Sequence, residues 1–146
     1  EIIISMKYIP LIIFSILILA GCDPVETDVV RTSWPDGSPK LIRSYIIEGS
    51  DSLAVKDVSY YESGAKRMAG PLKEGRRHGA WKYWYRNGML WSESEFIAGE
   101  QTGPAINYYP NGKRESKGEY IDGIRVGIWE FWDEKGFFEK EIDYSK

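Results

Sequence analysis

The residues with the most reactive side chains are a single cysteine, Cys22, and a single histidine, His78. One cysteine excludes an intrachain disulfide, and one cysteine with one histidine is too few for a His₂ or mixed Cys/His metal site within one chain. His78 is the only conventional base at neutral pH. It follows Arg76 and Arg77 in a loop that could bind an anion, such as a phosphate headgroup or an acidic partner. The alternative for this loop is a solvated turn.

Paired carboxylates offer the other possible chemistry. Glu93 and Glu95 alternate along one segment, so in a strand they would share a face. Two carboxyl groups about 5–9.5 Å apart can hydrolyse glycosides, but exposed strand faces commonly carry such charges and no pocket is indicated. The chain has neither a G-x-S-x-G elbow nor a P-loop pattern. The sequence therefore predicts a protein that is not an enzyme and uses no cofactor or metal.

The composition of the chain restricts the possible fold classes and the possible classes of partner. The 146 residues suggest one domain, or two at most. A net charge of −3, from 19 basic and 22 acidic side chains, gives no drive towards nucleic acid. The chain is rich in aromatic residues (10 Tyr, 6 Trp, 5 Phe) and in glycine, with 15. This bias is typical of an all-β protein with many turns.

The N-terminal segment has the features of an export signal. Residues 8–22 carry no charge and follow Lys7. Fifteen residues are short of the about 20 that a membrane-spanning helix needs, but they fit the apolar region of a signal peptide. We expect the natural start at Met6, because Glu1 would cancel the positive charge before the apolar run.

The end of this run, Leu19-Ala20-Gly21-Cys22, resembles the lipobox of a bacterial lipoprotein signal. The resemblance implies a signal peptide over residues 1–21, cleavage before Cys22 and lipid on its sulfur. Several acyl chains anchor a protein stably, so it implies a membrane-anchored protein of the cell envelope, at the inner or outer membrane and not in the cytoplasm. Residues 22–32 would be an acidic tether. The alternatives are an ordinary secretory signal or a core helix with a chance cysteine.

A 24-residue repeat organises the rest of the chain. Several columns of residues keep this step: Gly64, Gly88, Gly112 and Gly136; Gly75, Gly99 and Gly123; Gly79, Gly103 and Gly127; Trp84, Tyr108 and Trp132. Sustained periods of this length indicate repeat architectures. We expect a repeat domain over 33–146, with a degenerate first unit at 33–60. Three units follow at 61–84, 85–108 and 109–132, and 133–146 forms a cap.

Each unit contains two turn signals and two strand-length segments. One turn is of the Asn-Gly kind, as at Asn87-Gly88, and the other is a G-x-x-x-G loop, as at Gly75 to Gly79. The sequence thus predicts stacked antiparallel β-hairpins in a single elongated sheet. One hairpin is marginal in water, and stacked repeats stabilise one another. The open edges of such a sheet could also pair two copies.

The aromatic residues are the candidate contact surface. In a strand, Trp81, Tyr83 and Tyr85 would share one face, with Lys82 and Trp84 on the other. Core packing is the default for most of them, and contact with a partner is the alternative. The candidate binding residues are Arg76, Arg77, His78, Trp81, Trp84, Tyr108, Trp129 and Trp132.

The repeat resembles a known family. Residues 79–88 (GAWKYWYRNG) and 127–132 (GIWEFW) look like the MORN-repeat variant of bacterial proteins, whereas the middle unit has Ala105 in place of the tryptophan. The resemblance implies a scaffold or binding module, and many such proteins are described as antitoxin-like. We therefore expect an anchored module that binds a protein. The alternatives are an immunity or antitoxin-like protein that neutralises a toxin, and a glycan- or peptidoglycan-binding module.

Overall fold

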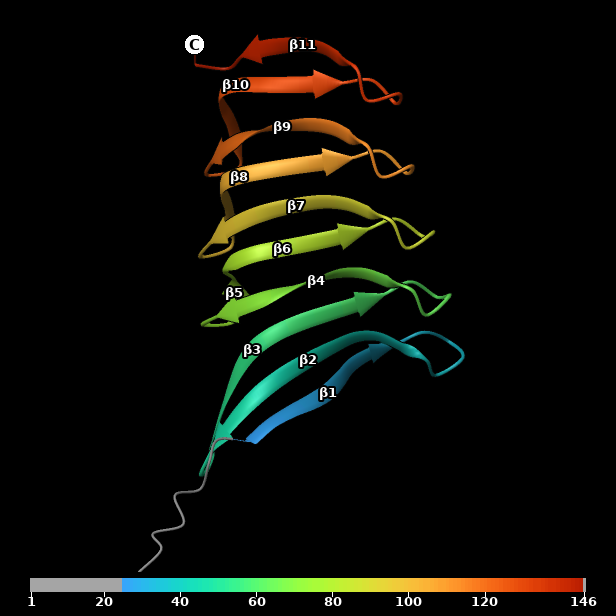
Figure 1. Cartoon of the computed structure of the whole chain (residues 1–146). Coiled ribbons are helices and arrows are strands. Elements are labelled where there is room, and N and C mark those ends of the chain that lie inside the picture. Colours follow the sequence, from blue (N-terminus) through green and yellow to red (C-terminus); the bar gives the residue numbers. More distant parts are fainter. Residues whose placement is uncertain (1–24, 146) are drawn as a thin grey trace, which may run out of the picture.

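The protein forms one open antiparallel β-sheet (Figure 1). The computed structural model describes residues 25–145, so the expected signal peptide and Cys22 lie outside the described residues. Within the described part there are eleven strands and no helix. The predicted all-β fold of stacked hairpin repeats is confirmed.

The strands follow one another across the sheet in chain order, except that the short β5 pairs only with β4. Consecutive hairpins therefore stack in one direction, from β1 at one end to β11 at the other (Figure 1). The strands are β1 (Val25–Ser33), β2 (Pro39–Glu48), β3 (Asp51–Tyr60), β4 (Lys66–Lys73), β5 (Arg76–Arg77), β6 (Gly79–Trp84), β7 (Leu90–Ile97), β8 (Glu100–Tyr108), β9 (Arg114–Ile121), β10 (Ile124–Trp132) and β11 (Phe138–Asp143).

Two kinds of turn alternate along the chain. At one end of the strands, the Tyr109 amide donates to the Lys113 carbonyl and the Gly112 amide to the Tyr109 carbonyl, each at 2.8 Å. The turns that begin at Trp34, Tyr61, Tyr85 and Asp133 repeat this pair of bonds. At the other end, Asp122 and Gly123 have positive φ angles of 49° and 79°. Positive φ at both central residues is the geometry of a tight hairpin turn.

The structure contradicts part of the expected tether, because residues 25–32 belong to strand β1. The acidic segment was predicted to be a linker as far as residue 32, but Val25–Ser33 forms the first strand and pairs with β2 from Val25 opposite Ile47 onward. The acidic residues lie among β-branched valines and threonines, which favour strands. Pairing also satisfies backbone groups of β2 that would otherwise lie at an open edge.

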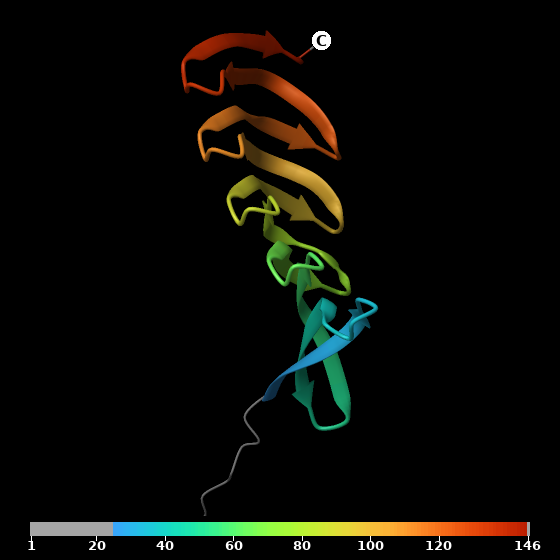
Figure 2. The ribbon, with the colours of Figure 1, turned by 90° about the vertical axis from the view of Figure 1, so that its right-hand side faces the viewer.

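The sheet is a single layer with two faces, and Figure 2 shows it turned by 90°. Cross-strand partners lie on the same face of a sheet. We call one side the tryptophan face; its central row is Asp57, Gly70, Trp81, Ser94, Ala105, Gly118 and Trp129. We call the other the charged face; its central row is Lys82, Glu93, Ile106, Lys117, Glu130 and Glu141.

Hydrogen bonds between neighbouring repeats hold the stack together. A tyrosine hydroxyl at the start of each unit donates to a backbone carbonyl 23 residues later, at 2.8–2.9 Å. The pairs are Tyr61 with Trp84, Tyr85 with Tyr108, and Tyr109 with Trp132. These tyrosines therefore have a structural role at each boundary, which is how repeat proteins gain stability from neighbours.

Candidate functional site

Trp81 lies in the core of the tryptophan face. Its side chain is 1% exposed, and its indole nitrogen donates to the Pro71 carbonyl at 3.0 Å. The ring lies flat against Gly70, where a Cβ atom would come within 2.4 Å of it. The Arg77 guanidinium lies over the other side, 4.6 Å from the ring centre. Trp81 is thus enclosed between a glycine and an arginine.

Trp129 repeats this arrangement 48 residues later. It is 0% exposed and donates to the Glu119 carbonyl at 3.2 Å. A Cβ atom at Gly118 would come within 2.3 Å of its ring, and the Arg125 guanidinium lies 4.3 Å from the ring centre. We call each set of glycine, arginine and tryptophan a Gly–Arg–Trp unit. Both tryptophans were candidate binding residues, but their burial leaves no ring surface for a ligand.

The basic loop is divided by the fold. Arg76 is exposed, whereas Arg77 turns onto the tryptophan face and donates to the Tyr83 hydroxyl at 2.9 Å. His78 is half-buried, and its backbone amide donates to the Pro71 carbonyl at 3.2 Å. The structure therefore uses Arg77 in packing, and leaves Arg76 as the exposed cation of the three.

Trp84, Tyr108 and Trp132 form a half-buried column on the charged face. They occupy one position of three successive repeats, directly before the turns that begin at Tyr85, Tyr109 and Asp133. Each has its own polar neighbour: Lys66 lies 6.0 Å from the Trp84 ring, Arg114 lies 4.9 Å from the Trp132 ring, and the Tyr108 hydroxyl donates to Glu93 at 3.1 Å. Of the predicted aromatic residues, these three keep accessible surface.

An ion pair links two strands of the charged face. Lys82 and Glu93 approach to 2.7 Å. The hydrogen bond from Lys82 lowers the pKa of the Glu93 carboxyl, and the same bond raises the pKa of the Lys82 amine. Burial, with a further contribution from Glu93, raises the pKa of the Tyr108 hydroxyl. These shifts come from structural pairing on a strand face, and exposed pairs of this kind contribute little to stability.

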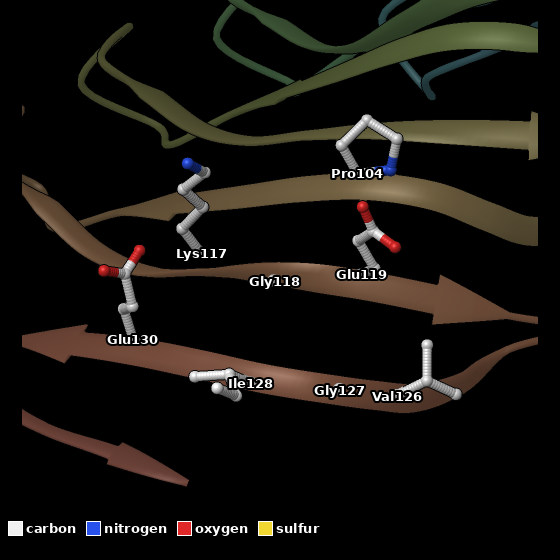
Figure 3. A pocket seen from close by; sticks show the side chains of 8 residues that line it. All are labelled: Pro104, Lys117, Gly118, Glu119, Val126, Gly127, Ile128 and Glu130. Carbon is white, nitrogen blue, oxygen red and sulfur yellow. The ribbon is translucent and has the colours of Figure 1, made fainter. Parts of the chain in front are cut away.

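A shallow groove lies further along the charged face, between β8, β9 and β10 (Figure 3). Its volume is about 430 Å³. Figure 3 shows Pro104 beside Glu119, its cross-strand partner, with Val126 and Ile128 on the next strand. Lys117 and Glu130 also line the groove. Smaller grooves recur between β6, β7 and β8, and between β3, β4 and β6. These grooves therefore result from the repeat. Each forms where the ladder of backbone hydrogen bonds between neighbouring strands is interrupted.

One hollow on the tryptophan face differs from these recurring grooves, because it lies where the repeat pattern of residues is interrupted. It lies over the middle unit, has a volume of about 200 Å³ and is lined by four aromatic and four polar residues. The aromatic residues are Tyr83, Trp91, Phe96 and Tyr120, and the polar ones are Ser92, Ser94, Gln101 and Asn107. None of the eight is charged. We call this feature the aromatic hollow.

The hollow exists because the middle unit lacks the bulky residues of its neighbours. Where the flanking repeats have Gly, Arg and Trp, this unit has Ser94, Gln101 and Ala105. Asn107 likewise replaces the aromatic Tyr83 and Phe131 of the neighbours. The introduced polar groups bond to one another or to the next strand: Gln101 donates to Ser94 and Asn107 to Ser116, both at 2.9 Å.

The sequence analysis missed the polar residues of the hollow, although it noted Ala105. The signal was present, because Ser94, Gln101 and Asn107 all differ from the residues 24 positions before and after them. Trp91 also stands out, since the equivalent positions hold Arg67 and Glu115. What the sequence could not provide is the knowledge that these columns meet at one place on one face.

Within residues 25–145, no group of three or more His, Cys, Asp or Glu side chains could hold a metal ion. In the same residues, no helix is long and apolar enough to cross a membrane.

Comparison with known proteins relates the repeat to a described repeat family. No curated protein matches the chain. Two segments, residues 77–98 and 101–122, match the family model of the MORN repeat variant. The two matches begin at equivalent positions, Arg77 and Gln101, one 24-residue period apart. The first contains Arg77 and Trp81, and the second contains Gln101 and Ala105, which replace them in the middle unit. Two segments at the centre of the chain are thus similar to the MORN repeat variant.

Proposed function

We propose that this protein is a non-catalytic binding module, anchored in the bacterial cell envelope by lipid on Cys22, that holds a protein partner away from the membrane. MORN repeats suggest a repeat-type binding module. The observation that carries the proposal is the exposed outer strand β11. All six of its residues are exposed, and Phe137 and Phe138 are 69% and 56% exposed.

The geometry suits presentation of this edge. Strand β1 begins three residues after Cys22, whereas β11 is at the opposite end of the sheet. With neighbouring strands about 4.8 Å apart, the ladder places β11 roughly 40 Å from β1. An exposed edge strand can bind an extended segment of a partner through main-chain hydrogen bonds. Glu139, Lys140 and Glu141 add charges that limit unselective pairing.

A site-specific photocrosslink tests the partner. A photoreactive amino acid replaces Phe138 in the full-length protein in its own cells, and the control places it at Leu53, which is also 56% exposed but lies in β3. We expect one stoichiometric protein adduct from position 138 and none from position 53. No adduct, or equal adducts from both positions, contradicts the proposal. An adduct of twice the chain mass indicates self-association through edges, and a toxin in the adduct indicates an immunity protein.

The anchor is tested separately. Labelled fatty acid should be incorporated into the wild-type protein and not into Cys22→Ala. Labelling of both proteins, or of neither, contradicts lipid attachment at Cys22 and leaves the crosslinking result independent.

A further inference from the structure

The aromatic hollow is a second candidate binding site, separate from the proposed protein-binding edge at β11. Its walls are aromatic rings, its floor holds amides and hydroxyls, and none of its lining residues is charged. We propose that the aromatic hollow binds a single neutral saccharide ring, such as one unit of a glycan. The inference goes beyond the proposed function, because it depends neither on the lipid anchor nor on the β11 edge.

The walls are suited to the faces of a sugar ring. The C–H groups of a pyranose carry partial positive charge, and an aromatic ring has a negative face that attracts such groups. Trp91 lines the hollow and is 46% exposed, and it packs against Tyr83 with ring centres 6.2 Å apart. Trp91 therefore offers an exposed indole whose orientation is supported by a neighbouring ring.

The flanking repeats hold two of the walls. Arg77 donates to the Tyr83 hydroxyl at 2.9 Å, and Arg125 donates to the Tyr120 hydroxyl at 3.4 Å. Each arginine belongs to a Gly–Arg–Trp unit, one on either side of the hollow. Because these cations are stacked on buried tryptophans, they orient the walls without lining the hollow. Such prior ordering lowers the entropic cost of binding.

The floor is suited to hydroxyl groups. The amide nitrogens of Gln101 and Asn107 donate to Ser94 and Ser116 within the protein. An amide carbonyl oxygen accepts hydrogen bonds, and a serine hydroxyl both donates and accepts. Sugar hydroxyls therefore have acceptors at the two amide carbonyl oxygens. Ser92 and Ser94, which are 8% and 6% exposed, bond to each other, and Ser94 also accepts from Gln101.

Size and charge argue for one neutral ring over other ligands. A volume of about 200 Å³ is below the about 300–1,000 Å³ of pockets for drug-sized molecules. An anionic headgroup would find no cation among the lining residues, since the arginines are engaged in stacking. An apolar side chain from a protein would cover the amide carbonyl oxygens of Gln101 and Asn107 without offering them a donor, which costs free energy.

The test uses the full-length protein in a detergent without sugar groups, with labelled tryptophan side chains observed by NMR. The ligands are cellotetraose, tetra-N-acetylchitotetraose and isolated cell-wall glycan. We expect the Trp91 indole signal to shift and saturate with at least one ligand, at a Kd of roughly 1 mM or tighter. The Trp132 signal, on the opposite face, is the internal control. Saturation by a soluble tetrasaccharide distinguishes a free oligosaccharide ligand from one recognised only in the intact wall.

A variant that fills the hollow provides the sharpest control. The triple substitution Ser94→Gly, Gln101→Arg and Ala105→Trp copies a Gly–Arg–Trp unit into the middle repeat. It should fold at least as stably as the wild type and bind sugar at least tenfold more weakly. Asn107→Ala, which keeps the hollow open and removes one amide, should weaken binding about tenfold and retain the fold.

Three outcomes overturn the proposal. One is the absence of a Trp91 shift with all three ligands. Another is equal sugar binding by the wild type and the filled variant. The third is loss of the protein adduct at position 138 in the filled variant while sugars cause no shift, which would assign the hollow to the protein interface. A sugar shift without any adduct would instead support the hollow and contradict the proposed protein partner.

Discussion

The Gly–Arg–Trp units and the middle repeat between them solve the same packing problem in opposite ways. In the outer units, an indole fills the face because the facing residue is glycine, and an arginine covers the ring. In the middle unit all three positions change together, to Ser94, Gln101 and Ala105. Within this set Gln101 donates a hydrogen bond to Ser94. The difference shows that the period constrains sets of residues that touch, and that a whole set can be exchanged without loss of the fold.

The largest expected effect comes from emptying an outer unit. Trp129→Ala should lower the free energy of unfolding by about 3–5 kcal/mol, because it leaves a cavity where a buried indole was. The matched change in the middle repeat, Ala105→Gly, should cost only about 0.5–1 kcal/mol. Urea unfolding of both variants measures the difference. Similar losses at the two sites would mean that the middle repeat packs as tightly as its neighbours.

Adding one methyl group to an outer unit should be the next largest effect. Gly118→Ala places a Cβ within 2.3 Å of the Trp129 ring, so it should cost about 1–3 kcal/mol or more through overpacking. The same substitution in a Trp129→Ala background should cost much less, because the two residues share one space. Ser94→Ala in the middle repeat is the control. Additive losses in the double variant would contradict the pairing of glycine with tryptophan.

Removing the arginine cover should have a moderate effect. Arg125→Gln, which copies the middle repeat, removes stacking on Trp129 and the bonds to Tyr120 and Tyr144. We expect a loss of about 1–2 kcal/mol in thermal or urea unfolding. Arg86→Gln, which removes a guanidinium 4.9 Å from the Tyr61 ring near a turn, should cost about 0.5 kcal/mol. A larger loss for Arg86→Gln would show that stacking on a buried ring has no special value.

The smallest effect should come from the charged face and should depend on pH. The pKa of Glu93 is lowered from 4.5, so the stabilisation is present above 4.5 and is lost as pH falls through the lower folded-state pKa. The pKa of Lys82 is raised from 10.5, so its contribution is present below 10.5 and is lost as pH rises through the folded-state pKa. Because both groups are partly exposed, Glu93→Gln should cost no more than about 0.5 kcal/mol at neutral pH.

Thermal unfolding at pH 7 and at pH 3 measures this contribution. The difference in stability between the wild type and Glu93→Gln should shrink as the pH falls from 7 to 3, because the unfolded-state carboxylate becomes protonated and the folded-state pKa is approached. Glu95→Gln is the control, as it removes a carboxylate from the same strand but not this ion pair. If the difference in stability between the wild type and Glu93→Gln were the same at both pH values, the Lys82–Glu93 ion pair would not be its cause.

The sequence by itself determined the period, the turns and the alternation of faces. Asn-Gly and G-x-x-x-G signals act locally, since they supply the backbone angles that a reversal needs. Strand alternation then fixes which residues share a side, as with Trp81 and Lys82. For these features, neighbours along the chain are sufficient. They yielded the all-β hairpin stack and the pairing of consecutive strands.

Only the tertiary structure decided which side chains are buried and which are accessible. Trp81 and Trp129 look like binding aromatics in sequence, but Gly70 and Gly118 on adjacent strands enclose them. Residues 25–32 look like an acidic tether, but β2 offers them an edge to pair with. Gln101 and Asn107 depart from the repeat in the sequence, but only the fold places them with Trp91 around one hollow. Burial and pocket shape depend on contacts between strands, and those contacts are set by register and packing across the sheet.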